Sequence, residues 1–342
     1  MDPVAALKRV AYLMERERAE ARRATAFRKA ARRLEDLPPG ELQRRIAAGT
    51  LTDLPDVGQR TAGVATEAAQ GRVPDYLAAL EERAGAPLAE GGETVRGWLR
   101  GDLHTHSEWS DGGSPIADMA HAAIELGHEY VALTDHSPRL TVARGLSPER
   151  LREQLDVVER LNAELAPFRI LTGIEVDILD DGELDQEPEL LARLDVVVAS
   201  VHSKLRMDRG AMTRRMVAAV QHPFVDVLGH CTGRLITGGR GTRPESEFDP
   251  DAVFGACLDN DVAVEINSRP ERRDPPTRLL EHALELGCLF SIDTDAHAPG
   301  QLEFLDHGCA RAQEAGVPRE RIVNARPLDE LLAWSRRSQP EA

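Results

Sequence analysis

The sequence predicts an α/β protein in which a closed or nearly closed barrel of parallel βα units follows a small all-α domain. From residue 101 on, seven short apolar runs rich in β-branched residues alternate with helical stretches, a pattern typical of parallel βα units. Six of the seven runs end in a histidine, aspartate or glutamate. The C-terminal ends of barrel strands meet on one face of the molecule. The position of these polar residues therefore favours a barrel over an open sheet.

The first 83 residues are expected to form the helical domain, because they contain no run that reads as a strand. A tight loop, LTDLPDVGQR, separates two short helices within it. Residues 84–100 are rich in Gly, Ala and Pro and are predicted to be a linker, and residues 101–342 to be the barrel domain. The predicted helices are residues 3–35, with a break near Ala24 and Thr25, residues 40–48 and residues 59–69.

The seven predicted strands of the barrel domain are short. The run DVVVAS is continuously apolar, as expected for a parallel strand that is buried on both faces. Helices are predicted between the strands, for example at residues 115–126, 148–166 and 251–258. The predicted strands are residues 101–104, 130–134, 169–173, 196–201, 225–229, 263–266 and 289–292.

The composition is that of an ordinary globular protein, with 42% hydrophobic and 29% charged residues among 342. No apolar run approaches the roughly 20 residues of a membrane span, and the charged, amphipathic N-terminus does not resemble a signal peptide. The four cysteines are widely spaced, which predicts reduced, buried thiols. We therefore expect a cytoplasmic protein without a membrane partner.

The net charge of −16 is unevenly distributed along the chain. Residues 1–100 carry 17 basic and 15 acidic side chains, whereas the other 242 residues carry 25 basic and 43 acidic ones. Such an asymmetry indicates two segments with different tasks.

Histidines and carboxylates gather at the predicted strand ends. In GDLHTHSEWSDG, His104 and His106 are two residues apart and so share one face of a strand. Packing many imidazoles and carboxylates together is unfavourable unless divalent metal ions bind them. There are more candidate ligands than one tetrahedral metal site can use, and their number suits two or three ions that share a carboxylate. Such metal clusters activate water and stabilise a phosphoryl group in transfer. The candidate ligands are His104, His106, Asp111, His136, Glu175, His202, His230, Asp295 and His297.

The motifs DLHTHSEWSDG, ALTDHS, GIEVDIL, VVASVHS, LGHCTGR, EIN and DTDAH together resemble the PHP (polymerase and histidinol phosphatase) family over about residues 101–332. The resemblance implies a distorted seven-stranded (βα) barrel with three divalent ions, Zn, Mn or Fe. By motif, one ion would take His104, His106, Glu175 and Asp295, a second would share Glu175 and add His202 and His230, and a third would take Asp111, His136 and His297.

Other polar residues lie close to these motifs. Asp135 and Asp293 are candidates for orienting the imidazoles, or else cap strand ends. Arg234 is a candidate catalytic residue that clamps a phosphate, with a surface salt bridge as the alternative. The residues expected to line the pocket are Ser203, Lys204, Asn267 and Arg269.

The segments AFRKAARRLEDLP and LTDLPDVGQRTA resemble the N-terminal helix-hairpin-helix domain of family-X DNA polymerases. The resemblance implies that the hairpin grips a DNA phosphate through backbone N–H groups. Asp56 stands where the hairpin usually has glycine, and Val64 near the position of the lyase lysine. The polymerase core is absent, so no polymerase activity is expected. The residues expected to hold DNA, unless the domain is only a scaffold, are Arg28, Lys29, Arg32, Arg33 and Arg60.

These features predict a metal-dependent phosphoesterase acting on DNA 3′ ends, as a 3′-5′ exonuclease or 3′-phosphatase, in which Glu175 bridges the metals. One alternative is a small-molecule phosphatase such as histidinol phosphatase, which the acidic barrel domain favours. Another is a non-catalytic DNA-binding accessory protein.

Overall fold

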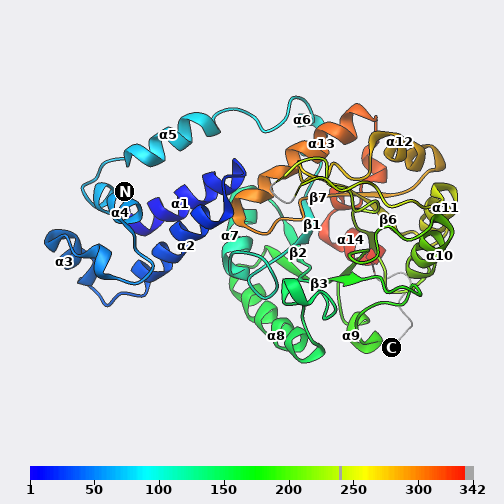
Figure 1. Cartoon of the computed structure of the whole chain (residues 1–342), viewed down its shortest axis with the longest axis horizontal. Coiled ribbons are helices and arrows are strands. Elements are labelled where there is room, and N and C mark those ends of the chain that lie inside the picture. Colours follow the sequence, from blue (N-terminus) through cyan, green and yellow to red (C-terminus); the bar gives the residue numbers. More distant parts are fainter. Residues whose placement is uncertain (239–240, 336–342) are drawn as a thin grey trace. The chain divides into compact units, whose positions relative to one another are not determined.

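The computed structural model describes residues 1–238 and 241–335 (Figure 1). The chain divides into two compact units. One unit comprises Met1–Pro87 with Ala298–Gln301, and the other comprises Leu88–His297 with Leu302–Ala342. The segment predicted as a linker holds the short helix α6 (Glu93–Arg96), and its Val95 is buried in the core of the second unit.

Seven parallel strands form one sheet in the second unit, in the order of the chain from β1 to β7. A parallel bridge between Thr105 and Ala296 brings the first and last strands together. The predicted fold class, a nearly closed and distorted barrel of seven strands, is confirmed. The strands are β1 (Gly101–Thr105), β2 (Tyr130–Leu133), β3 (Arg169–Asp177), β4 (Val196–Ser200), β5 (Val227–Leu228), β6 (Ala263–Asn267) and β7 (Phe290–Asp293).

The distortion centres on β3, which the sequence prediction ended too early, at residue 173. Its first half pairs with β2 through Thr172, and its second half pairs with β4 from Gly173 to Asp177. Glu175 therefore lies inside the strand rather than beyond its end. A Cβ on Gly173 would lie 2.8 Å from the carbonyl oxygen of Val196, so the neighbouring strand requires glycine here.

Helices follow most strands, and several begin with a side-chain cap. Ser147 accepts a hydrogen bond from the N–H of Arg150 at the start of α8, and Asp208 accepts one from Ala211 at the start of α10. Because these helices begin after strands end, their N-termini lie at the C-terminal end of the barrel. Besides α6, the helices are α7 (Ile116–Glu125), α8 (Pro148–Leu165), α9 (Pro188–Leu191), α10 (Arg209–Val220), α11 (Pro250–Asp259), α12 (Thr277–Leu286), α13 (Leu305–Glu314) and α14 (Leu328–Ser335).

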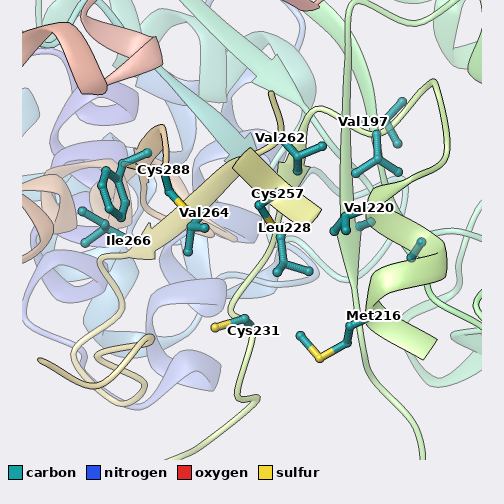
Figure 2. Packing of buried hydrophobic residues seen from close by; sticks show 14 of the residues in the cluster. Val197, Met216, Val220, Leu228, Cys231, Cys257, Val262, Val264, Ile266 and Cys288 are labelled. Atoms are coloured by element: carbon teal, nitrogen blue, oxygen red, sulfur yellow. The ribbon is translucent and has the colours of Figure 1, made fainter. Parts of the chain in front are cut away.

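The strands are buried on both faces, as the apolar run DVVVAS predicted. On β4, Val196 and Val198 pack into one apolar cluster, and Val197 and Ala199 pack into the other. Figure 2 shows part of the second cluster, where three thiols lie among aliphatic side chains. All four cysteines are free and buried, as predicted: Cys231, Cys257, Cys288 and Cys309.

The first unit is all-helical. The predicted break near Ala24 is wrong: α1 ends at Arg16, Arg18 adopts a left-handed φ of 58°, and α2 runs through Ala24, which is buried. The turn falls at Glu, Arg and Ala residues, none of which is a strong helix breaker, so a sequence pattern does not predict it. The helices are α1 (Pro3–Arg16), α2 (Ala21–Glu35), α3 (Glu41–Ala48), α4 (Gln59–Ala69) and α5 (Asp75–Ala84).

Among the described residues of both units, no helix combines the length and the apolar character that crossing a membrane requires.

Candidate metal centre

All nine candidate ligands meet at the C-terminal end of the barrel. His104 lies in β1 and Glu175 in β3, and the others follow strand ends in short loops. Three groups have ligand atoms within 4.8 Å of one another: His104, His106 and Glu175; His136, Glu175 and His202; and His106, Asp111, His136 and His297.

Glu175 lies between two sets of imidazoles. Its Oε1 is 2.9 Å from Nε2 of His230 and 3.2 Å from Nε2 of His202. Its Oε2 faces three other rings. A carboxylate with each oxygen directed at a different set of ligands has the arrangement of a bridge between two cations. The atoms facing Oε2 are His104 Nε2 at 3.4 Å, His106 Nε2 at 3.6 Å and His136 Nδ1 at 2.8 Å.

Asp111 lies at the centre of a second group of ligands, nearer the surface. Its Oδ1 is 3.3 Å from Nε2 of His297 and 3.4 Å from Nε2 of His136. Asp295 lies with its Oδ1 3.3 Å from Nε2 of His106. Asp111 is 32% exposed and His297 is 22% exposed, whereas His106 is fully buried, so the Asp111 side of the cluster is the one that solvent reaches.

The buried atoms of this cluster fit metal ions. Within the described residues, His104 Nε2, both ring nitrogens of His106 and Glu175 Oε2 are buried without a hydrogen-bond partner. Leaving such groups unpaired is costly, and a divalent cation coordinated by imidazole nitrogen and carboxylate oxygen removes that cost. The donor set of nitrogen and oxygen suits Zn, Mn or Fe.

Burial and mutual charge set the protonation of the cluster. Burial, together with the nearby rings of His297 and His136, lowers the pKa of His106 to about 3. Burial opposes ionisation of Glu175, but His202 and the other imidazoles hold its pKa well below the ordinary value. The same carboxylate, against the effect of burial, raises the pKa of His202 to about 9. A cation that displaces the proton of His202 would therefore meet the ionised carboxylate of Glu175.

Of the two alternatives for Asp135 and Asp293, the orientation of imidazoles is wrong. Asp135 accepts hydrogen bonds from Ser107, Ser110 and Gln154, and Asp293 accepts one from the N–H of Leu103. Within the described part of the chain, neither carboxylate has an imidazole among its hydrogen-bond partners. Both side chains tie the loops and strands around the cluster together.

Two carboxylates that the sequence analysis did not assign contact the imidazoles instead. Glu265, in β6, lies 2.6 Å from Nδ1 of His104, and Asp177, at the end of β3, lies 3.5 Å from Nδ1 of His202. Glu265 belongs to the EIN motif and Asp177 to GIEVDIL, so both lay within motifs but carried no assigned role.

Arginines from the β6–α12 loop contact the rim of the cluster. Arg269 donates to the carbonyl oxygen of Asp295, and its Nη1 lies 2.9 Å from His297 Nδ1. Arg272 Nε is 3.2 Å from Asp295 Oδ2. Arg269 therefore lies at the site, as expected for a lining residue, and Asn267 also contacts Asp295, at 3.3 Å.

The other two expected lining residues, Ser203 and Lys204, contact groups outside the cluster. Lys204 forms an exposed ion pair with Asp180, and the carbonyl oxygen of Ser203 accepts a hydrogen bond from Arg215. The guanidinium of Arg234 contacts the carbonyl oxygens of residues 272 and 273 and, at 3.2 Å, Glu245.

The predicted hairpin occupies the loop before α4. Asp56 has a φ of 66°, in the left-handed region that favours glycine, and its carboxylate is 3.7 Å from Arg33. The expectation that Arg28 holds DNA is wrong, because Arg28 is 7% exposed and forms two 2.6 Å hydrogen bonds with the buried Glu15. Val64 is buried in the core of this unit.

Comparisons with known proteins agree with this architecture. Residues 102–268 match the family described as PHP domain, and residues 1–73 match the helix-hairpin-helix domain. The chain is 40% identical over 242 residues to "DNA polymerase/3'-5' exonuclease PolX" of Bacillus subtilis, an alignment that covers 71% of this chain and 42% of that protein. The chain thus spans less than half the length of that relative.

Shorter relatives align over nearly their whole length. A "probable phosphatase" of Aeromonas hydrophila is 30% identical over 254 residues, which cover 70% of this chain and 96% of that protein. A crystal structure of histidinol phosphate phosphatase from Lactococcus lactis, with zinc, L-histidinol and phosphate, is 20% identical with a TM-score of 0.48, and covers 64% of this chain and 94% of that one. By the two family matches and the relatives that are 40% and 30% identical, together with the barrel and motifs described above, the chain belongs to the PHP family of phosphoester hydrolases and carries an N-terminal helix-hairpin-helix domain.

Proposed function

We propose that this protein is a metal-dependent phosphoesterase that acts on DNA 3′ ends, as a 3′-5′ exonuclease or 3′-phosphatase. The observation that carries the proposal is the position of Glu175, whose two oxygens face separate sets of buried imidazoles within 3.6 Å. A bridged cluster of cations is the arrangement that hydrolyses phosphate esters by in-line displacement.

The proposed ligand sets divide the cluster among three ions, of Zn, Mn or Fe. When bound, these ions would supply Lewis-acid stabilisation of charge on phosphorus and a nucleophilic water at neutral pH. The first set is His104, His106, Glu175 and Asp295; the second is Glu175, His202 and His230; the third is Asp111, His136 and His297.

The chain's own residues position the substrate and the ligands. Glu175 fixes the spacing of the cluster, because parallel pairing holds its backbone between Val198 of β4 and His136 after β2. Substrate approaches on the exposed side, at Asp111 and His297. There, Arg269 and Arg272 present guanidinium groups that suit a phosphoryl oxygen, since arginine pairs with phosphate in a planar, bidentate manner.

The first unit favours DNA as the substrate. Its match to a helix-hairpin-helix domain gives a reason for contact with a DNA backbone, and the Bacillus subtilis relative carries 3′-5′ exonuclease in its name. Next to the hairpin, Arg33 is partly exposed and Arg60 is exposed. These two residues are the proposed contacts to the DNA backbone.

A second candidate is hydrolysis of a small phosphomonoester, such as histidinol phosphate. The charge of the barrel domain favours it, because 43 acidic against 25 basic side chains in residues 101–342 repel a long polyanion. The relatives called probable phosphatases also support it. A non-catalytic DNA-binding role is the third candidate, and it predicts salt-dependent binding without turnover.

A side-by-side assay separates these candidates. A 5′-labelled DNA oligonucleotide and histidinol phosphate are each incubated with metal-loaded protein, in Mn²⁺ or Zn²⁺. The test variant combines His104→Ala with His106→Ala, and the matched control combines His121→Ala with His222→Ala, two histidines outside the cluster.

Shortening of the DNA by wild type and the control, but not by the test variant, is the expected result. Phosphate release from histidinol phosphate alone would overturn the DNA assignment and leave the small-molecule phosphatase. Salt-dependent DNA binding with turnover of neither substrate would overturn both enzymatic assignments.

A further inference from the structure

A cavity of about 690 Å³ lies in the second unit, apart from the metal centre, and four arginines line it. Arg209, Arg234, Arg243 and Arg278 come from three separate segments of the chain. The cavity is of the size that proteins use to hold small ligands or one part of a larger ligand. Its acidic lining residues are Glu245 and Glu247.

The cavity lies at the same end of the barrel as the metal centre. Arg209 begins α10, which follows β4, and Arg278 lies in the first turn of α12, which follows β6. Arg234 comes four residues after His230, a proposed metal ligand. In a barrel of parallel strands, segments that follow strands lie at the C-terminal end.

Two residues connect the cavity directly to the cluster. The Nε of Arg234 donates a 3.0 Å hydrogen bond to the carbonyl oxygen of Arg272. The Nε of Arg272 in turn lies 3.2 Å from Oδ2 of Asp295. Arg234 and Arg272 therefore link the cavity to the rim of the metal centre, through the backbone carbonyl and the guanidinium of Arg272.

Two of the four guanidinium groups, those of Arg209 and Arg278, are exposed to a ligand. The side chains of Arg209 and Arg278 are 60% and 64% exposed, and their acidic partners are Asp249, at 3.4 Å, and Glu245. Glu245 is shared, because Arg234 also contacts it, at 3.2 Å. The ion pairs of Arg209 and Arg278 involve mostly exposed guanidinium groups and contribute little free energy, so a phosphate can replace them at small cost.

We propose that this cavity binds the backbone phosphates of single-stranded DNA, on the 5′ side of the terminal nucleotide that the metal centre holds. The inference rests on the proposed DNA 3′-end activity. The barrel domain as a whole is strongly acidic, so a strand needs local positive charge to stay in place. Four arginines in one cavity at the catalytic end supply it, and arginine binds phosphate independently of base sequence.

The test compares substrates of two lengths. Wild type, the variant Arg209→Glu with Arg278→Glu, and the control Arg214→Glu with Arg319→Glu are assayed on 5′-labelled dT10 and dT2. Arg214 and Arg319 are exposed and do not line the cavity, so the control makes the same change in net charge. Both changed residues in the test variant are mostly exposed, and circular dichroism checks that each variant is folded.

Wild type should prefer dT10, and the test variant should lose about tenfold in the ratio of kcat/KM for dT10 to that for dT2. Loss of two phosphate contacts should also make the salt dependence of kcat/KM for dT10 shallower by about 1.4 in log–log slope. The control should keep the wild-type ratio and slope. Equal loss in the control, or no loss in the test variant, would overturn the inference while DNA hydrolysis stands. Failure of wild type to cut either oligonucleotide would overturn the exonuclease form of the proposed function and this inference with it.

Discussion

Nδ1 of His104 lies 2.6 Å from Oε1 of Glu265, and both side chains are fully buried. The other oxygen of Glu265 accepts a hydrogen bond from the backbone N–H of His230. One carboxylate on β6 thus ties together proposed ligands from β1 and β5. Because it accepts the proton of Nδ1, it leaves Nε2 of His104 free to face Glu175 and a cation.

Replacing Glu265 with glutamine should weaken metal binding without removing a ligand. The amide keeps the shape of the side chain but lacks the charge that orients and strengthens the His104 ring, an effect of about 10- to 100-fold in metal affinity. Calorimetric titration of metal-free protein with Zn²⁺ measures it. The exposed Glu285→Gln is the control, and wild-type affinity in Glu265→Gln would refute the orienting role.

Glu175→Gln and Asp111→Asn should differ in the number of ions lost. Glu175 faces two sets of imidazoles, so its replacement should reduce the metal content by two ions per chain. Asp111 contacts His297 and His136, the other two ligands of the third set. Its replacement should therefore remove one ion. Metal content after dialysis, measured by mass spectrometry, tests this. Equal losses in the two variants would contradict a bridging role for Glu175.

Asp56→Gly should increase the affinity of the first unit for DNA. The change removes a carboxylate beside the proposed phosphate site, worth about 1 kcal/mol in water, and so about fivefold in Kd. Glycine also adopts the left-handed φ of 66° without the steric strain that the Cβ of aspartate causes there. Fluorescence anisotropy with a labelled oligonucleotide at low salt measures the affinity.

Two further variants separate charge from backbone conformation at this hairpin. Asp56→Asn removes only the charge and should give most of the gain, whereas Asp53→Asn, an exposed change in the same loop, should give less. An unchanged Kd in Asp56→Gly would mean that this hairpin does not bind DNA.

The barrel could be predicted from the sequence because its signals are local. Apolar runs mark the strands, and the period of two places His104, in β1, and His106, directly after it, on the same face. The bridging position of Glu175 has no such local signal, since β3 extends four residues past the predicted end and changes its partner strand at Gly173.

The errors in the predicted site residues concern which side chains contact one another in the folded chain. His104 and Glu265 are separated by 161 residues, and no spacing within a motif shows that they meet. Asp135 stands directly before His136 in TDH, yet its side chain points to Ser107 and Gln154. Arg28 lies in a basic stretch, but it is buried against Glu15 of the preceding helix. Burial and pairing of a charged side chain depend on packing that the sequence pattern does not specify.

His128 provides a measure of stability that is independent of the metal centre. It is 6% exposed, and its Nε2 lies 3.2 Å from Nη2 of Arg96. Burial, with a smaller contribution from Arg96, lowers the pKa of His128 to about 3. The unfolded chain binds this proton near pH 6.5, so between pH 6.5 and 3 the unfolded state holds more protons than the folded state.

The free energy of unfolding therefore carries no penalty from His128 above pH 6.5. It decreases progressively as the pH falls from 6.5 toward 3, because the unfolded chain takes up a proton that the folded chain does not. Between pH 7 and pH 5 the loss from this group is about 2 kcal/mol in the free energy of unfolding. His128→Gln cannot take up the proton, so its free energy of unfolding should fall by about that much less than wild type over this interval, and the exposed His121→Gln should behave as wild type. Urea unfolding at both pH values, followed by tryptophan fluorescence, measures the barrel unit alone, because Trp98, Trp109 and Trp334 all lie in it. If His128→Gln lost as much stability as wild type, the proton uptake on unfolding would have to come from other groups.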